Sequence, residues 1–176
     1  MTSAWQRRHF SAALAGLALH VGTGMSSALS PAWAQDTALP IPDSLPAVAA
    51  AAARLGEPLV LLISLRGCPY CELVRRNYLL PAQAEGLPVW QINMQDKQRP
   101  LVGFDGQPSN AAEQIARWKV RLAPTLLFLN PRGLPLAERL VGIASVDFYG
   151  AYLEQRLATS RLALKAAPGQ VFKRNI

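Results

Sequence analysis

Histidine is nearly absent from this sequence of 176 residues, which contains only His9 and His20. Both lie in a segment that we expect to be removed during export, so the mature chain would contain no histidine. That absence excludes a Cys–His or Ser–His nucleophile pair, and a metal or haem held by histidine, in the mature chain. The haem attachment motif Cys-x-x-Cys-His is also missing, because Glu72 follows Cys71. We therefore expect no cofactor and no metal.

Apolar runs long enough to span a membrane are also missing. The first 34 residues are nevertheless typical of a secretory signal, which needs only a shorter apolar stretch. Arg7 and Arg8 precede an apolar stretch from Phe10 to Leu19, which is too short for a membrane span of about 20 residues. Ala32-Trp33-Ala34 matches a small-x-small cleavage site, so the mature chain would begin at Gln35 in the periplasm. Arg7-Arg8-His9-Phe10 resembles the twin-arginine signal, and the general secretory route is an equal alternative. An uncleaved anchor is a further alternative.

Excess charge of one sign is confined to the ends of the chain, although the net charge is +7. Residues 35–160 carry 12 basic and 11 acidic residues, whereas residues 161–176 carry four basic residues and no acid. Such a tail could dock on a membrane surface or an acidic partner, but a solvated terminus is the simpler interpretation. Nothing in this pattern indicates nucleic-acid binding.

Cysteine occurs only twice, in Cys68-Pro69-Tyr70-Cys71, directly after the apolar run Leu59–Leu65. A strand that ends in this turn and opens a helix places the first sulfur at the helix N-terminus. Unpaired backbone N–H groups and the helix dipole there favour the thiolate over the thiol. Two cysteines at this spacing form a dithiol/disulfide couple, whose chemistry is thiol–disulfide exchange. As a purely structural crosslink the pair would contribute little, because it closes a very short loop.

The remaining pattern predicts one α/β domain with a mixed sheet and helices on both faces. We expect a lead-in segment and short helix over residues 35–56, the main domain over 57–160 and a basic tail over 161–176. The expected strands are 59–65, 88–94, 126–129 and 136–141. The expected helices are 47–55, 68–80 and 111–119, of which the second is closed by Pro81 and the third is capped by Asn110 and Glu113. A final helix is expected after Ser145, with Phe148, Tyr152, Leu153 and Leu157 on its apolar face. Residues 95–108 are expected to form a loop.

Three segments in this order resemble the thioredoxin family, and the resemblance spans residues 57–160. The first is the strand, Cys68-Pro69-Tyr70-Cys71 and the helix. The second is Ala123-Pro124-Thr125 before an apolar strand, and the third is Leu140-Val141-Gly142-Ile143-Ala144-Ser145 before the last helix. The resemblance implies a thioredoxin-like fold in which Pro124 is cis and faces the disulfide. The long segment between Cys71 and Pro124 is similar to that of exported thioredoxin-like proteins associated with sulfur oxidation and cytochrome maturation.

The same resemblance implies roles for residues around the cysteines. Cys68 would attack a target disulfide and Cys71 would resolve the mixed disulfide. The backbone of Ala123 would pair with a substrate strand, and Pro69 and Tyr70 would contribute to the substrate-binding surface. Arg66 is a candidate for favouring the Cys68 thiolate, although it could equally be a solvated loop residue.

Two positions depart from the family pattern. The buried Asp that helps to deprotonate the resolving thiol is replaced by Leu62, and the Trp before the first cysteine by Gly67. Glu57 and Glu72 are candidate substitutes for the acid, but a surface role is the simpler interpretation for both.

We therefore expect a monomeric, exported thiol–disulfide oxidoreductase that reduces protein disulfides and is recharged by a membrane thiol electron carrier. The resemblance leaves open a disulfide-forming oxidant or isomerase of the same fold. Two thiolates also suit soft Cu(I), so a copper carrier that uses Cys68 and Cys71 is a further alternative.

Overall fold

The computed structural model describes residues 38–166. The predicted signal peptide with its cleavage site after Ala34, the first residues of the lead-in and the last ten residues of the basic tail lie outside the described residues. Within the described residues, no helix is long and apolar enough to cross a membrane.

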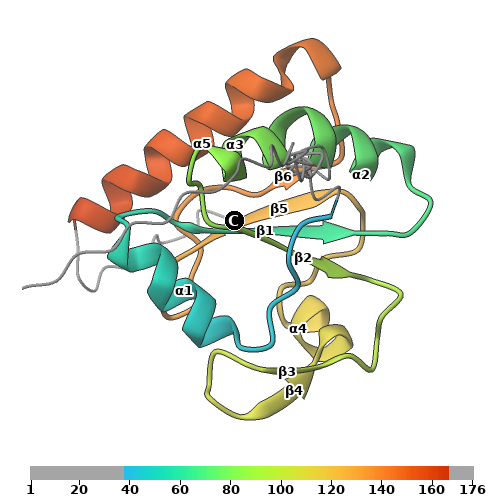
Figure 1. Cartoon of the computed structure of the whole chain (residues 1–176), viewed down its shortest axis with the longest axis vertical. Helices are drawn as coiled ribbons and strands as arrows, with labels where there is room; N and C mark the ends of the chain where they lie inside the picture. Colours follow the sequence, from blue (N-terminus) through green and yellow to red (C-terminus); the bar gives the residue numbers. More distant parts are fainter. Residues whose placement is uncertain (1–37, 167–176) are drawn as a thin grey trace, which may run out of the picture. The chain divides into compact units, whose positions relative to one another are not determined.

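A four-stranded mixed sheet forms the centre of the domain, with the strand order β2-β1-β5-β6 (Figure 1). Its strands are β1 (Leu59–Ser64), β2 (Val89–Asn93), β5 (Thr125–Leu129) and β6 (Leu140–Val141). β1 runs parallel to β2 and antiparallel to β5, which in turn pairs antiparallel with β6. All six residues of β1 are buried, as expected of a continuous apolar run that is covered on both faces.

Helices cover both faces of the sheet, and the alternation of side chains along β1 divides the core into two clusters. Val60 and Leu62 pack with one set of helices, which comprises α2 (Pro69–Val74), a π-helical turn η1 (Arg75–Leu79), α3 (Leu80–Ala84) and α5 (Val146–Ala166). Leu59, Leu61 and Ile63 pack on the other face with α1 (Leu45–Arg54) and α4 (Ala111–Arg117). The expected α/β architecture with helices on both faces is confirmed.

The lead-in before α1 is part of this core rather than an appendage. Leu39 is only 2% exposed and packs in the same cluster as Val60 and Leu62. The Gln91 N–H donates to the Pro40 carbonyl and the Val102 N–H donates to the Asp43 carbonyl, both at 2.8 Å. Residues 38–43, which we call the N-terminal strap, therefore run from the outer edge of β2 at Gln91 to β3 at Val102.

The helix after Cys68 continues past Pro81, where we expected it to end. In the π-helical turn before the proline, the Leu80 N–H bonds to the Arg75 carbonyl five residues back. The wider turn leaves room for the pyrrolidine ring, and Pro81 then lies in the first turn of α3, where no N–H donor is needed. The helix is therefore continuous from Pro69 to Ala84, and we call it the active-site helix because it begins at the cysteine pair that is expected to react.

Residues 95–108 were expected to be a loop, but part of this segment forms a small antiparallel hairpin. Its strands are β3 (Pro100–Val102) and β4 (Pro108–Asn110), with Leu101 opposite Ser109. Leu101 is buried in the second core cluster, which explains why this polar, proline-rich segment has a fixed structure. Asn110 then begins α4 by accepting from the Glu113 N–H, as expected.

The expected strand 136–141 is reduced to the two residues of β6. Glu138 pairs with Arg156 of α5, and Arg139 donates to the Trp118 carbonyl. Backbone pairing with β5 is kept at the start of the expected strand, where the Leu136 N–H donates to the Phe128 carbonyl at 2.8 Å, and it resumes at β6.

The final helix differs from expectation in its buried face and its length. Tyr149, Leu153 and Leu157 are buried, whereas Phe148 and Tyr152 are exposed. The apolar residues of its first two turns occupy two neighbouring faces, and only packing decides which of them is covered. The helix also extends to Ala166 and so includes the first residues of the predicted tail.

Candidate functional site

The two cysteines lie where β1 gives way to the active-site helix. β1 ends at Ser64, and the chain turns through Gly67, whose φ of +71° suits a residue without a side chain. Cys68 is the N-cap residue of α2 and Pro69 occupies the first helical turn. The predicted junction of strand, Cys-x-x-Cys and helix is therefore present.

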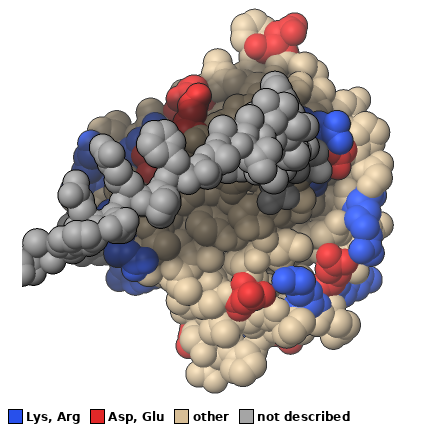
Figure 2. Space-filling model, viewed as in Figure 1, with Lys and Arg blue, Asp and Glu red and all other residues tan. Residues whose placement is uncertain are grey.

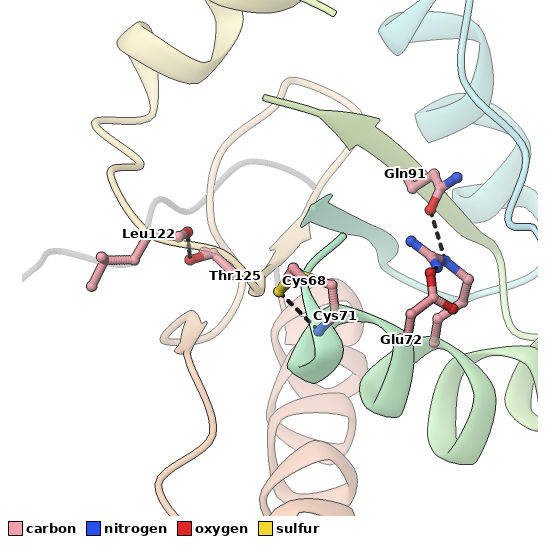
Figure 3. The surroundings of a disulfide bond; sticks show 7 residues. Cys68, Cys71, Glu72, Gln91, Leu122 and Thr125 are labelled. Atoms are coloured by element: carbon pink, nitrogen blue, oxygen red, sulfur yellow. Dashed lines mark hydrogen bonds and ion pairs between the residues drawn. A yellow bond between two sulfur atoms is a disulfide. The ribbon is translucent and has the colours of Figure 1, made fainter. Parts of the chain in front are cut away.

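Cys68 and Cys71 form a disulfide, with their Cα atoms 5.3 Å apart (Figure 3). The Cys71 N–H donates to the Cys68 Sγ at 3.1 Å, so the Cys68 sulfur takes the place of a capping oxygen at the helix N-terminus. Cys68 is half-buried, whereas Cys71 is fully buried. Solvent therefore reaches Cys68 but not Cys71, and Cys68 is the residue whose sulfur the backbone N–H and the helix dipole would stabilise as a thiolate.

The loop before β5 lies at the same end of the sheet as the disulfide. Ile63 pairs with Thr125, so the preceding residue, Pro124, comes next to the end of β1 from which the cysteine loop leaves. The Ala123–Pro124 peptide bond is cis. Figure 3 draws Leu122 and Thr125 among the surroundings of the disulfide, with the Thr125 hydroxyl donating to the Leu122 carbonyl at 2.8 Å.

In the backbone of this loop, Pro124 is hydrogen-bonded to a neighbouring segment, whereas Ala123 is not. The Pro124 carbonyl accepts from the Gly142 N–H at 2.7 Å, which ties the loop to the end of β6. By contrast, the N–H and C=O of Ala123 make no hydrogen bond within residues 38–166. These two groups beside Cys68 are available to an extended peptide.

The other two predicted substrate-binding residues, Pro69 and Tyr70, are exposed on the first turn of the helix. Tyr70 is 60% exposed, and Leu65 and Leu122 present further apolar surface on the two neighbouring loops. An apolar surface with a reactive sulfur beside it suits an unfolded or extended protein segment better than a small polar molecule.

Arg66, predicted to modulate the thiolate, has its guanidinium bound to other groups. Its Nη1 lies 2.9 Å from Asp96 Oδ1 and its Nε donates to Gln95 Oε1 at 3.0 Å. Asp96 offsets most of the charge that Arg66 could offer to Cys68.

Neither glutamate considered as a substitute acid is placed for that role. Glu57 lies before the start of β1, at the opposite end from Cys68, and accepts two hydrogen bonds from Arg161. Glu72 pairs with Arg75 and Arg76. Both carboxylates are thus held in ion pairs with arginines.

Sequence reasoning missed two parts of the site. Arg75 is buried and donates from Nε to Gln91 Oε1 at 3.0 Å, which fastens the active-site helix to β2 (Figure 3). Thr125 braces the cis-proline loop. Thr125 directly follows Pro124 and could have been noticed, but no local signal distinguishes a buried arginine from an exposed one on a helix.

The described residues contain no group of three or more His, Cys, Asp or Glu side chains that could hold a metal ion. Two sulfurs that form a disulfide, a capped helix N-terminus and an open backbone edge together equip the site for exchange between a thiolate and a disulfide.

Comparison with known proteins identifies the same architecture. The family model described as "Thioredoxin-like domain" matches residues 45–157. The expected thioredoxin-like fold is thus confirmed, and the match begins at α1, earlier than the expected boundary at residue 57. A search of curated proteins found no match.

Solved structures with a similar fold include proteins from a plant and from bacteria. They include oxidized thioredoxin O2 from Arabidopsis thaliana, at 18% identity over 69% of this chain and 96% of that chain, with a TM-score of 0.43. The reduced periplasmic thioredoxin SoxS from Paracoccus pantotrophus is 21% identical over 59% of this chain and 99% of that one, with a TM-score of 0.40. A thioredoxin from Thermus thermophilus is 19% identical over 68% and 86%, with a TM-score of 0.45.

Proposed function

The chain belongs to the thioredoxin-like domain family, and from this membership and its cysteine pair we propose that it is an exported thiol–disulfide oxidoreductase that reduces protein disulfides. One observation carries the proposal. Cys68 is half-buried and its Sγ accepts from the Cys71 N–H at the start of a helix, whereas its partner in the disulfide, Cys71, is fully buried. That asymmetry separates an attacking sulfur from a resolving one.

The reaction transfers two electrons in two exchange steps. In the reduced protein, the Cys68 thiolate attacks one sulfur of a substrate disulfide, which forms a mixed disulfide and releases the other substrate sulfur as a thiolate. The Cys71 thiol loses its proton to water or to that released thiolate and attacks the Cys68 Sγ. The mixed disulfide breaks, the second substrate sulfur leaves and takes up a proton, and the Cys68–Cys71 disulfide forms. The substrate gains two electrons and this protein loses two.

The substrate segment is held beside Cys68 by the open backbone of Ala123. An antiparallel pair of hydrogen bonds to its N–H and C=O would align the target disulfide with the Cys68 Sγ. Tyr70 and Leu122 would contact apolar side chains on the two sides of the bond. Their broad exposure favours a range of protein substrates over one small molecule.

We place the protein in the periplasm, on the strength of the signal-like first 34 residues. Because that compartment is oxidising, a reductant there needs an outside supply of electrons. We propose that a membrane thiol carrier returns two electrons to the Cys68–Cys71 disulfide by the reverse exchange. We also propose that the protein acts as a monomer.

Single-cysteine variants test the proposed roles. Cys71→Ser should accumulate a mixed disulfide between Cys68 and a model substrate such as insulin, visible as a dithiothreitol-sensitive mass increase. Cys68→Ser should form no such adduct, because the remaining thiol is buried. Turnover of insulin with dithiothreitol as donor should require both cysteines. Equal adduct formation by the two variants would contradict the assignment.

The reduction potential tests whether the protein acts as a reductant or as an oxidant of its protein substrates. A reductant should equilibrate with glutathione or dithiothreitol at a potential in the range of thioredoxins, about −270 mV. A potential near about −120 mV, together with oxidation of reduced substrates by the purified protein, would instead assign an oxidant.

A further inference from the structure

The cis-proline loop carries a cation that nothing in the described structure neutralises. Arg121 is exposed and makes no hydrogen bond or ion pair within residues 38–166, and the same holds for the side chain of Lys119. The arginine on the neighbouring loop, Arg66, differs because Asp96 holds it. In the view of Figure 2, Lys and Arg side chains gather along the right-hand edge, on which Figure 1 places the connection from β1 to α2.

The backbone of Arg121 is fixed on both sides. Val120 before it is buried, and its N–H donates to the Ile115 carbonyl at 3.1 Å. Leu122 after it is tied through its carbonyl to the Thr125 hydroxyl. Arg121 is therefore held two residues from Ala123, whose open N–H and C=O are beside the disulfide. Only its side chain is free to reach a bound segment.

Most carboxylates around the disulfide are already paired. Asp96 binds Arg66, and Glu72 binds Arg75 and Arg76. Asp147, in the first turn of α5, has no cationic partner within the described residues, but the positive end of its own helix offsets its charge. The segment that receives a substrate strand therefore presents uncompensated positive charge next to apolar Leu122.

We propose that Arg121 is a specificity-determining residue that selects protein substrates with an acidic side chain close to the target disulfide. The proposal rests on the proposed function, because it concerns the segment from which Cys68 takes its disulfide. An acidic group near the end of the paired strand meets the guanidinium as an exposed ion pair, while an apolar neighbour packs on Leu122. Such a contact favours association and orientation rather than the exchange chemistry itself.

Three peptides that share one intramolecular disulfide and a fluorescence reporter test this inference. Their flanking residues are two glutamates, two glutamines or two lysines, and dithiothreitol supplies the electrons. At low ionic strength, kcat/KM for the acidic peptide should exceed that for the basic one by about 2- to 5-fold, the range of an exposed ion pair. The ratio should fall toward one in about 0.5 M salt.

Charge variants then locate the effect. Arg121→Glu should invert the acidic-to-basic ratio, and Arg121→Lys should retain the preference. Arg132→Glu is the matched control, because Arg132 is also exposed and has no side-chain partner within the described residues but follows the opposite end of β5. It should leave the ratio unchanged.

The outcomes separate this inference from the proposed function. Reduction of all three peptides at similar rates, or an equal shift of the ratio in Arg121→Glu and Arg132→Glu, would overturn the role of Arg121 alone. If the wild-type protein reduces none of the peptides and does not reduce insulin, the proposed function and this inference fall together.

Discussion

At the scale of single residues, Tyr149 is a side chain whose aromatic ring favours burial although its hydroxyl does not. It is 2% exposed, its ring centroid lies 5.0 Å from that of Tyr78, and its hydroxyl has no hydrogen-bond partner within the described residues. Burial, with a smaller contribution from Tyr78, raises the pKa of Tyr149 well above its ordinary value of 10.0. The ring stabilises the core, whereas the hydroxyl costs free energy.

Tyr149→Phe should therefore leave the protein as stable as the wild type at pH 7, or more stable by about 1 kcal/mol. The wild-type protein should lose stability as the pH rises above about 10, because the tyrosine ionises in the unfolded chain but not in the folded one. Tyr149→Phe should lose less over the same pH range. Urea unfolding of both proteins at pH 8 and pH 10.5 measures the difference, and parallel losses would contradict the assignment.

At the scale of elements, the turn between β5 and β6 also anchors the hairpin insertion. Gly133 has a φ of +75°, and a Cβ built there would lie 2.9 Å or less from three atoms of the Phe104 ring. Phe104 follows β3 and packs against the second core cluster. The absence of a side chain at residue 133 therefore lets the insertion dock on the sheet.

Gly133→Ala should lower the free energy of unfolding by more than the strain of placing alanine in a left-handed backbone conformation would by itself. Gly56 is a matched control, since its φ is +73° but a Cβ there would meet nothing within 4 Å. Gly56→Ala should cost about 1–2 kcal/mol through its backbone. Gly133→Ala should cost at least about 1 kcal/mol more through overpacking. Urea titrations of both variants compare the two, and equal losses would show that Phe104 simply moves aside.

At the scale of the whole molecule, the N-terminal strap closes one side of the sheet. Without residues 38–43 the outer edge of β2 would present the Gln91 N–H unpaired, and an open edge invites pairing with other chains. Leu39 holds the strap to the core cluster that it shares with Val74 of the active-site helix. An intact domain therefore needs the chain from Leu39 onward.

Leu39→Ala should destabilise the protein by about 2–5 kcal/mol, as for other fully buried leucines. Leu162→Ala, at a position that is 67% exposed, is the control and should change stability by less than about 0.5 kcal/mol. A chain that begins at Gln35 should fold as a monomer, whereas one that begins at Ser44 should be less stable and should associate. Thermal unfolding compares the stability of the two leucine variants and of the two truncated chains. Size-exclusion chromatography shows whether either truncated chain associates. A stable, monomeric Ser44 chain would show that the strap is dispensable.

The sequence by itself determined the features that depend on neighbouring residues. The apolar run of β1, the Cys68-Pro69 start of a helix and the Asn110–Glu113 cap are all local, because a few adjacent side chains satisfy or restrict the backbone there. Tertiary structure decided what depends on contacts between distant segments: which face of α5 is covered, which distant side chains hold Arg66 and Arg75, and how the strap covers the edge of β2. Those outcomes reflect burial and pairing between residues far apart in the chain, which periodicity and propensity do not encode.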